Sequence, residues 1–304
     1  RDYYGIEVEV ESTRAFPTIF QVKYPISGQP LVSIVIPNKD HTADLKRCIE
    51  SILNRSTWKH LEIIVVENNS CEQSIRDYYR ELEQTSRVQV VTYEGEFNYS
   101  RINNYGVTFT KGDYLLFLNN DTEVITPDWI EQLLMYAQRE DVGAVGAKLY
   151  YADNTIQHAG VVIGLGAHRS AGHTHYKMPK EHLGYMGRLC YAQDMTAVTA
   201  ACLMVKRSIY EEVGGLDESF TISLNDVDFC LKIREKGYLN IFTPFAELYH
   251  YESKTRGLEE GEKLRRYEKE CAHFREKWRA ALDAGDPYYN PNFSLDYSDF
   301  TLRF

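Results

Sequence analysis

The sequence lacks any long apolar stretch. None of its hydrophobic runs approaches the roughly 18 to 20 residues of a membrane-spanning helix, and no charged segment followed by an apolar leader opens the chain. We therefore expect a soluble, cytoplasmic protein without a transmembrane segment, at most in peripheral contact with the inner face of the plasma membrane. The chain begins with Arg1 and not with Met, which favours a piece of a longer, multidomain polypeptide.

Positive charge is also scarce. Lys and Arg number 34 against 44 Asp and Glu, which gives a formal net charge of -10 at pH 7. Binding to a nucleic-acid backbone requires a clustered excess of Lys and Arg, so no nucleic-acid partner is expected. An anionic ligand would need local compensation, such as a metal ion.

Cysteine pairs at metal-binding or redox spacing are absent. The six cysteines are scattered and none forms a C-x-x-C pair. A chain of this size does not need disulfides for stability, so reduced thiols are expected.

Glycine is missing from the turn where a dinucleotide-binding motif needs it. The turn that follows the first predicted strand, Pro37 to His41, contains no glycine. The later stretch from Gly164 to Arg169 lacks the third glycine of the fingerprint and does not open a helix. A P-loop is absent as well. The sequence therefore argues against a dinucleotide-binding protein and against a P-loop nucleotide-binding protein.

What the first half of the sequence does contain is a regular alternation of strands and helices. The predicted strands are Leu31–Ile36, Leu61–Val66, Val88–Thr92 and Tyr114–Leu118, and the predicted helices are 42–53, 72–85 and 100–110. Strands and helices that alternate through short connections predict βαβ units, and therefore a parallel, doubly wound α/β sheet.

Three of these strands end in polar clusters. The clusters are Pro37-Asn38-Lys39-Asp40, Glu67-Asn68-Asn69-Ser70 and Asn119-Asn120-Asp121. Ligands of open α/β sheets bind outside the carboxyl ends of the strands. We therefore expect the three clusters to line one crevice.

The second half has a mixed pattern of elements. The predicted elements are a helix over Trp129–Arg139, strands over Val142–Tyr151, Thr155–Ile163, Ala197–Val205, Leu239–Thr243 and Glu247–Tyr251, a helix opened by Asn225–Asp228, and a charged helix over 258–282. Residues 164–190 are long for a plain connection, which favours a functional loop. Its histidines, His168, His173, His175 and His182, allow a zinc site, but no carboxylate or Cys stands at ligand spacing among them, which favours a polar loop.

Two pairs of polar residues that contain aspartate allow a chemical interpretation. Asn119 and Asp121 lie on the same side of a strand end, and Mg²⁺ or Mn²⁺ takes such oxygen ligands together with substrate phosphates. The same residues also begin turns, so both interpretations stand. Asp226 and Asp228 lie at a predicted helix N-terminus, where the helix dipole favours carboxylates, so capping and catalysis are both open. Lys254 and Arg256, which follow His250, are suited to hold a diphosphate or else are solvated.

Taken together, four motifs resemble family 2 glycosyltransferases. They are Val32–Asn38, Ile64–Ser70, Leu116–Asp121 and Asn225–Asp228, in this order. The resemblance covers about residues 31–257, and it is nearest to bacterial members that build O-antigen, rhamnan or related cell-surface polysaccharides. It implies an α/β, A-type glycosyltransferase (nucleotide-diphospho-sugar transferase) fold, with a mostly parallel doubly wound central sheet flanked by helices and a smaller mixed acceptor-side region.

The resemblance also implies domain limits. Residues 1–30 are expected to form an arm or the end of a preceding domain, and 31–257 the glycosyltransferase domain. Within that domain, 31–125 is the nucleotide-binding half and 126–257 the acceptor-side half. Residues 258–304 are expected to form a C-terminal helix and an aromatic tail.

The residue roles implied by the resemblance are those of an inverting transferase. Asp226 is the implied general base, and Asp121 and His250 are the implied metal residues for Mg²⁺ or Mn²⁺. The expected donor-binding residues are Pro37, Asn38, Asp40, Glu67, Asn69, Asn98, Asn104, Asn119, Asn120, Lys254 and Arg256. The sequence has Asn119 and Asn225 at positions where many relatives have an acid.

The implied function is transfer of a sugar, such as rhamnose or another hexose, from a nucleotide-diphosphate sugar. The acceptor would be a hydroxyl of a growing glycan or lipid-linked glycan. Two other functions are compatible with the same fold. One is a non-catalytic carbohydrate-binding or scaffolding module, and the other is a sugar nucleotidyltransferase, which normally has a glycine-rich loop after its first strand.

Overall fold

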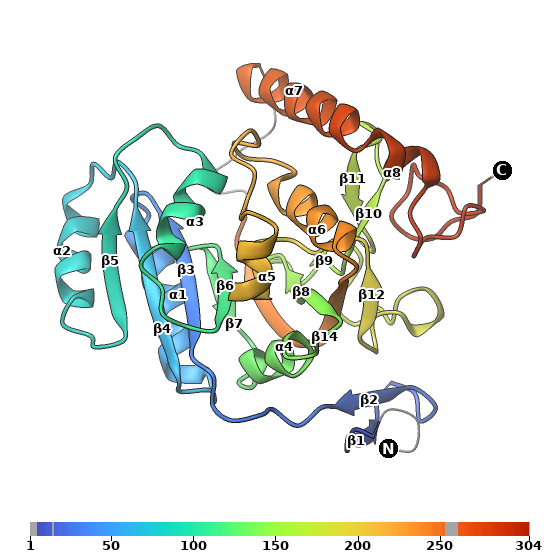
Figure 1. The fold of residues 1–304 in the computed structure, drawn as a ribbon, viewed down its shortest axis with the longest axis horizontal. Coiled ribbons are helices and arrows are strands. Elements are labelled where there is room, and N and C mark those ends of the chain that lie inside the picture. The colour runs from blue at the N-terminus through green and yellow to red at the C-terminus, as the bar shows by residue number, and fades with distance from the viewer. Residues whose placement is uncertain (1–4, 14, 253–260, 304) are drawn as a thin grey trace.

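A ten-stranded sheet forms the centre of the molecule (Figure 1). The computed structural model describes residues 5–13, 15–252 and 261–303. The strands are β1 (Glu9–Ser12), β2 (Phe20–Lys23), β3 (Val32–Asn38), β4 (Leu61–Glu67), β5 (Val88–Thr92), β6 (Tyr114–Leu118), β7 (Thr122–Val124), β8 (Val142–Tyr150), β9 (Ile156–His158), β10 (Val161–Ile163), β11 (Ala171–His173), β12 (Gln193–Met195), β13 (Cys202–Lys206) and β14 (Leu239–His250).

Helices cover this sheet. They are α1 (Thr42–Arg55), α2 (Gln73–Leu82), α3 (Tyr99–Val107), α4 (Trp129–Ala137), α5 (Arg207–Glu212), α6 (Asn225–Glu235), α7 (Glu262–Lys277) and α8 (Arg279–Ala284), with a 3-10 turn η1 (Tyr185–Gly187). The alternation predicted for the first half is confirmed, since each of the four predicted strands is present with a helix between it and the next.

The strand order is β12-β14-β8-β13-β6-β3-β4-β5. Strands β6, β3, β4 and β5 run parallel, and β14 pairs parallel to β8, while β13 lies antiparallel between β8 and β6. The sheet is thus parallel in its first half and mixed in its second. Because β3, β4 and β6 share one direction, their carboxyl ends meet at one edge.

The side chains of the parallel strands alternate between two hydrophobic cores. On β6, Leu116 and Leu118 enter the core that contains the buried residues of α1, α2 and α4, whereas Leu115 and Phe117 enter the core on the opposite face. Successive side chains of a strand point to opposite faces, and a strand covered on both faces is therefore apolar throughout. The continuous apolar runs in the sequence are explained by this double burial.

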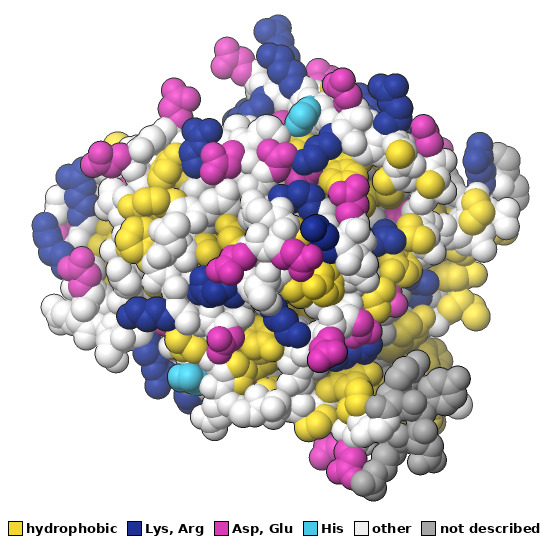
Figure 2. Space-filling view, in the orientation of Figure 1, with side chains coloured by type: hydrophobic (Ala, Val, Ile, Leu, Met, Phe, Trp, Pro, Cys, Tyr) yellow, Lys and Arg dark blue, Asp and Glu magenta, His cyan; other side chains and the backbone are white. Residues whose placement is uncertain are grey.

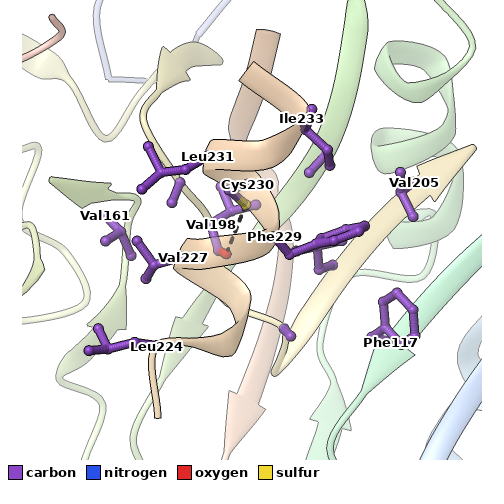
Figure 3. Close-up of a cluster of buried hydrophobic side chains, with 14 of the residues drawn as sticks. Phe117, Val161, Val198, Val205, Leu224, Val227, Phe229, Cys230, Leu231 and Ile233 are labelled. Carbon is purple, nitrogen blue, oxygen red and sulfur yellow. Dashed lines mark hydrogen bonds between the residues drawn. The ribbon is translucent and has the colours of Figure 1, made fainter. Parts of the chain in front are cut away.

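Helix α6 packs against the sheet through apolar contacts (Figure 3). Phe229 points toward Phe117 of β6, with ring centroids 6.4 Å apart, and Val227 points toward Val161 of β10. Cys230 Sγ donates to the carbonyl of Val198 at 3.6 Å. These contacts fix the N-terminal end of α6, where Asp226 lies.

Two predicted strand boundaries are wrong for local reasons. The strand predicted over Thr155–Ile163 is divided at Gly160 into β9 and β10. Gly160 has a φ of 94°, and a Cβ atom at this position would lie 2.4 Å from Met195 Cε. The strands predicted over Leu239–Thr243 and Glu247–Tyr251 form one strand, β14, whose register against β8 shifts between Thr243 and Glu247. Pro244 lies within this shift and has no N–H to donate to a neighbouring strand.

Two further predictions differ in extent. The strand predicted over Ala197–Val205 begins only at Cys202, because Ala197 forms an isolated bridge with Val161 and 198–201 form a loop. The charged helix predicted over 258–282 is divided into α7 and α8 within the described residues.

The surface carries mixed charge. In Figure 2 the basic and acidic side chains are interspersed over the face shown, and hydrophobic side chains gather toward the right-hand edge. No helix in the described part of the chain combines the length and apolarity of a membrane span. All six cysteines are free thiols, and five of them are buried.

Candidate active site

Two adjoining cavities lie at the carboxyl edge of the parallel strands. The larger cavity, of about 340 Å³, is lined by the ends of β3 and β6, by β14 and by α7. The smaller, of about 220 Å³, is lined by the loop before β13, by β11 and by the start of α6. Both are bordered by Tyr99, Asn119, Ile222, His250 and Glu252. The two cavities therefore share a wall. A ligand in either cavity would contact these shared residues.

The three predicted strand-end clusters meet here. Asn120 Nδ2 donates to Asn38 Oδ1 at 2.5 Å, and Asn38 Nδ2 donates to the Tyr79 hydroxyl at 2.7 Å. The Tyr79 hydroxyl in turn donates to Glu67 Oε2 at 2.6 Å. One chain of hydrogen bonds thus joins the ends of β6, β3 and β4, as their parallel arrangement predicted.

Six of the predicted donor and metal residues line the larger cavity. They are Pro37, Asn38, Asn119, Asn120, Asp121 and His250. Asp226, the predicted base, lines the smaller cavity. Lys254 and Arg256 lie outside the described residues.

Three other predicted residues shape the turns beside the cavity and do not line it. Asp40 Oδ1 accepts from the backbone N–H groups of Cys71 and Glu72 at 2.7 and 2.9 Å, and these bonds, that from Glu72 above all, lower the pKa of Asp40. Glu67 Oε1 accepts from Ser70 N at 2.6 Å, and Asn69 Nδ2 donates to Gly95 O at 2.6 Å. Their side chains are engaged in holding the backbone.

Asn98 and Asn104 lie away from both cavity walls. Asn98 caps α3 by accepting from Arg101 N at 2.9 Å, and its Nδ2 donates to Glu218 O at 2.8 Å. Asn104 bonds to both backbone groups of Leu216, at 2.9 and 3.0 Å. The structure gives both side chains a structural role, which is to hold the 216–218 loop against α3.

The two acidic residues at the start of α6 have different environments. Asp226 Oδ2 accepts from Thr199 Oγ1 and Ala200 N at 2.8 and 3.1 Å, and its Oδ1 accepts from Val227 N at 2.9 Å. A carboxylate has about four acceptor positions, so one is left toward the cavity. Asp228 is fully buried and binds Lys277 Nζ at 2.6 Å and Trp278 Nε1 at 2.8 Å. Asp226 is therefore the one of the two that faces a cavity, and Asp228 holds α7 against α6.

A hydrogen-bonded chain sets the tautomer of His250. Glu252 Oε2 accepts from Gln157 Nε2 at 2.6 Å, which turns Gln157 Oε1 toward His250 Nδ1 at 2.7 Å. An amide oxygen only accepts, so Nδ1 carries a proton, and in the neutral ring Nε2 then presents its lone pair. A neutral imidazole held in this way is a common metal ligand.

Asp121 and His250 converge on one point of the larger cavity. Asp121 Oδ1 lies 3.1 Å from His250 Nε2, and Asn119 Nδ2 lies 3.0 Å from the same nitrogen. A carboxylate oxygen this close to an imidazole nitrogen favours positive charge between them, which a proton on Nε2 or a bound cation supplies. No group of three or more His, Cys, Asp or Glu suited to a metal occurs among the described residues. The pair thus fits part of a metal's coordination shell, and a bound phosphate would have to complete it.

The histidines of the 164–190 segment do not gather into a zinc site within the described chain. His173 lines the smaller cavity and its Nδ1 lies 2.8 Å from Nδ1 of the buried His158. Burial lowers the pKa of both side chains, so the pair is neutral at neutral pH. His175 is buried elsewhere and accepts from Tyr185 N at 3.2 Å. The residues Ala171–His173 nevertheless bring part of this segment to a cavity wall.

Several cavity residues carry no signal in the sequence that would have marked them. They are His41, Tyr99, Thr199, Lys263 and Arg266. Tyr99 donates to Ala200 O at 3.1 Å across the shared wall. Gln157 and Glu252 also line the cavities, and the hydrogen bond between them depends on folding.

The sheet topology and the two-part cleft define an A-type glycosyltransferase fold. The structure of GalNAc-T7 with UDP, GalNAc and Mn²⁺ is similar over 86% of this chain and 50% of that one, with a TM-score of 0.68 at 16% identity. The mannosyltransferase PcManGT from Pyrobaculum calidifontis, solved with GDP-Man and Mn²⁺, is similar over 85% of this chain and 79% of that one, with a TM-score of 0.56 at 14% identity.

Within that fold, the chain belongs to glycosyl transferase family 2. The model of this family, described as Glycosyl transferase family 2, matches residues 33–214. The family that the motifs implied is therefore confirmed, and with it the class of enzyme.

Two curated relatives match nearly the whole chain. An uncharacterised protein, y4gI, of Sinorhizobium fredii is 47% identical over 94% of this chain and 32% of its own length. The O-antigen biosynthesis protein RfbC of Myxococcus xanthus is 36% identical over 96% of this chain and 22% of its own length. The chain thus spans a third or less of either relative.

Proposed function

We propose that this chain is an inverting glycosyltransferase domain that moves a sugar from a nucleotide-diphosphate donor to a hydroxyl of a bacterial cell-surface glycan. The shared wall between the two cavities carries the proposal. Asp226 lines only the smaller cavity and Asp121 only the larger one, whereas His250, Asn119 and Tyr99 line both. The name of the RfbC relative supports a polysaccharide as the product.

The larger cavity is the proposed donor site. Asn38 and Asn120 are held together by their hydrogen bond, and Pro37 lies on the same wall. Asp121 Oδ1 and His250 Nε2 would hold Mg²⁺ or Mn²⁺ once Nε2 exchanges its contact with Asn119. The ion would stabilise the negative charge that develops on the departing diphosphate.

The smaller cavity is the proposed acceptor site. An acceptor hydroxyl there would give its proton to the Asp226 carboxylate while its oxygen forms a bond to the anomeric carbon of the donor sugar. The bond from that carbon to the diphosphate breaks on the opposite side, which inverts the configuration. General-base assistance of this kind contributes roughly 10² to 10⁴ in rate.

One hydroxyl and two backbone N–H groups hold Asp226 for this step. Thr199 Oγ1 and Ala200 N both bond to Oδ2, and the backbone N–H of Val227 bonds to Oδ1. These three donors fix the orientation of the carboxylate and leave one acceptor position for the acceptor hydroxyl.

The test is an assay of a panel of nucleotide-diphosphate sugars, with release of nucleoside diphosphate as the readout. Asp226→Asn should abolish turnover while nucleoside-diphosphate binding, measured by calorimetry, stays as in the wild type. Glu235→Gln, at the exposed end of the same helix, is the matched control and should keep full turnover.

Three results would contradict the proposal. Wild-type turnover by Asp226→Asn would remove the assigned base. Release of pyrophosphate would show a sugar nucleotidyltransferase, and glycan binding without any turnover would show a carbohydrate-binding module.

A further inference from the structure

Helix α7 lies beyond the part of the chain that the family model matches, yet it forms one side of the cleft. Lys263 and Arg266 line the larger cavity, and Tyr267 lines the smaller one. Residues three and four apart project from the same face of a helix. One face of α7 therefore presents two cations to the proposed donor cavity.

The helix is fixed in that position. The Glu270 carboxylate accepts from the backbone N–H groups of Thr221, Ile222 and Ser223 at 2.8, 3.0 and 3.0 Å. Lys277 Nζ binds both Asp217 and Asp228 at 2.6 Å. These bonds tie α7 to the loop that leads into α6, and Figure 1 shows α7 running beside that loop. The cations on its inner face are held in place before any ligand binds.

Arg266 has an unused donor in this position. Its Nε is buried and has no hydrogen-bond partner among the described residues. A guanidinium group stays charged in proteins, so its buried N–H groups can be satisfied only by an acceptor. A buried donor without a partner is unfavourable, which points to a ligand that supplies the acceptor.

The charge of the cavity indicates which ligand. Besides Arg266 and Lys263, Lys39 and His41 line it from the turn after β3, against the acids Asp121 and Glu252. A chain with a net charge of -10 thus gathers basic side chains at this cavity. The planar fork of a guanidinium matches two phosphate oxygens, and a lysine adds a mobile positive charge.

We propose that Arg266, assisted by Lys263, binds the diphosphate of the donor nucleotide, so that α7 is part of the donor site. The assignment rests on the proposed glycosyltransferase function. It adds to the donor site a helix, α7, in which none of the sequence motifs lies.

The experiment compares nucleoside diphosphates with nucleoside monophosphates by calorimetry, in the presence of Mn²⁺. UDP, GDP, dTDP and CDP are first tested on the wild type, and the tightest binder is compared with its monophosphate. Arg266→Ala should weaken binding of the diphosphate by about tenfold or more, the effect expected when a charged hydrogen bond is lost. Binding of the monophosphate should change by less than about twofold, since the contact is to the phosphate that it lacks.

The neighbouring Arg265 provides a matched control, because it is exposed on the same helix and lines neither cavity. Arg265→Ala should bind both nucleotides as the wild type does. Arg266→Gln keeps the side-chain stem and serves if Arg266→Ala fails to fold, as judged by thermal unfolding.

Wild-type affinity of the folded Arg266 variants for the diphosphate would overturn the assignment and leave the proposed function intact. An equal loss for the monophosphate and the diphosphate would overturn it as well, since it would show general damage to the site. If the wild type binds no nucleoside diphosphate at all, the proposed function itself is wrong, and the role of Arg266 falls with it.

Discussion

Asp121 Oδ1 and His250 Nε2 lie 3.1 Å apart, although one follows β6 and the other ends β14. The strand β14 brings them together because β7, which follows Asp121, pairs with it in antiparallel register, with Thr122 opposite His250. The convergence of a carboxylate with an imidazole lone pair predicts that activity depends on a metal. Treatment with EDTA should stop nucleoside-diphosphate release, and added Mg²⁺ or Mn²⁺ should restore it. Full activity in the chelator would show that the pair serves another purpose.

Gln157 should tune metal affinity without being a ligand. Its Oε1 accepts from His250 Nδ1 at 2.7 Å and so, in the neutral ring, leaves the lone pair of Nε2 for a metal. Replacing such a partner typically weakens metal binding by roughly 10- to 100-fold. Gln157→Leu should show this loss in a Mn²⁺ titration, whereas Gln89→Leu, at an exposed position of β5, should not. Unchanged Mn²⁺ affinity in Gln157→Leu would show that His250 is not a ligand of the metal.

Asp228 should affect stability more than Asp226 does. Asp228 is fully buried and bonded to Lys277 and Trp278, so Asp228→Asn removes a charged partner from both. Loss of hydrogen bonds to a charged group predicts a decrease of roughly 2 kcal/mol in the free energy of unfolding. Urea denaturation measures it. A larger loss in Asp226→Asn than in Asp228→Asn would reverse the roles given to the two acids.

Glu270 should position the loop before α6. Glu270→Gln keeps one acceptor oxygen but turns an N–H₂ group toward backbone donors of 221–223, which misplaces Ile222 and the start of α6. We expect kcat to fall about tenfold or more with a smaller change in donor KM, because chemistry depends on small displacements of the base. Glu268→Gln, on the exposed face of the same helix, is the control. A lower melting temperature with unchanged kcat would indicate a purely structural role.

Acid should destabilise the protein through its buried histidines. Burial lowers the pKa of His175 to about 3, with smaller contributions from the positive charges of Arg188, His182 and Lys148, and Asp299 opposes them. The unfolded chain takes up protons as the pH falls through about 6.5, while the folded chain does not, so stability present above that pH is lost below it.

His175→Gln should therefore reduce the drop in the free energy of unfolding between pH 7.5 and 5.5 by about 1 kcal/mol. The exposed His60→Gln should leave the drop unchanged. An identical pH dependence in His175→Gln and the wild type would show that this side chain is not kept neutral by the fold.

The strands of the parallel half of the sheet could be predicted from the local hydrophobic pattern of the sequence. The apolar runs of β3, β4 and β6 are continuous because both faces of each strand are buried, and that pattern is visible without coordinates. The breaks at Gly160 and Pro244 were harder to predict, since each depends on a neighbour distant in sequence, Met195 in one case and β8 in the other.

The candidate site divides in the same way. Asn38 ends β3, and Asn120 and Asp121 follow β6, so the direction of the parallel strands alone brings them to one edge. Asn98 and Asn104 stand at predicted donor positions, but their side chains hold the 216–218 loop, which no local pattern reveals. The sequence by itself thus determined the α/β class, the family and the strand-end half of the cleft, because these follow from periodicity and from contiguous motifs. Only the tertiary structure decided that Gln157 and Glu252 set the His250 tautomer and that Arg266 faces the larger cavity, because these contacts join segments whose proximity depends on the packing of β14 and α7.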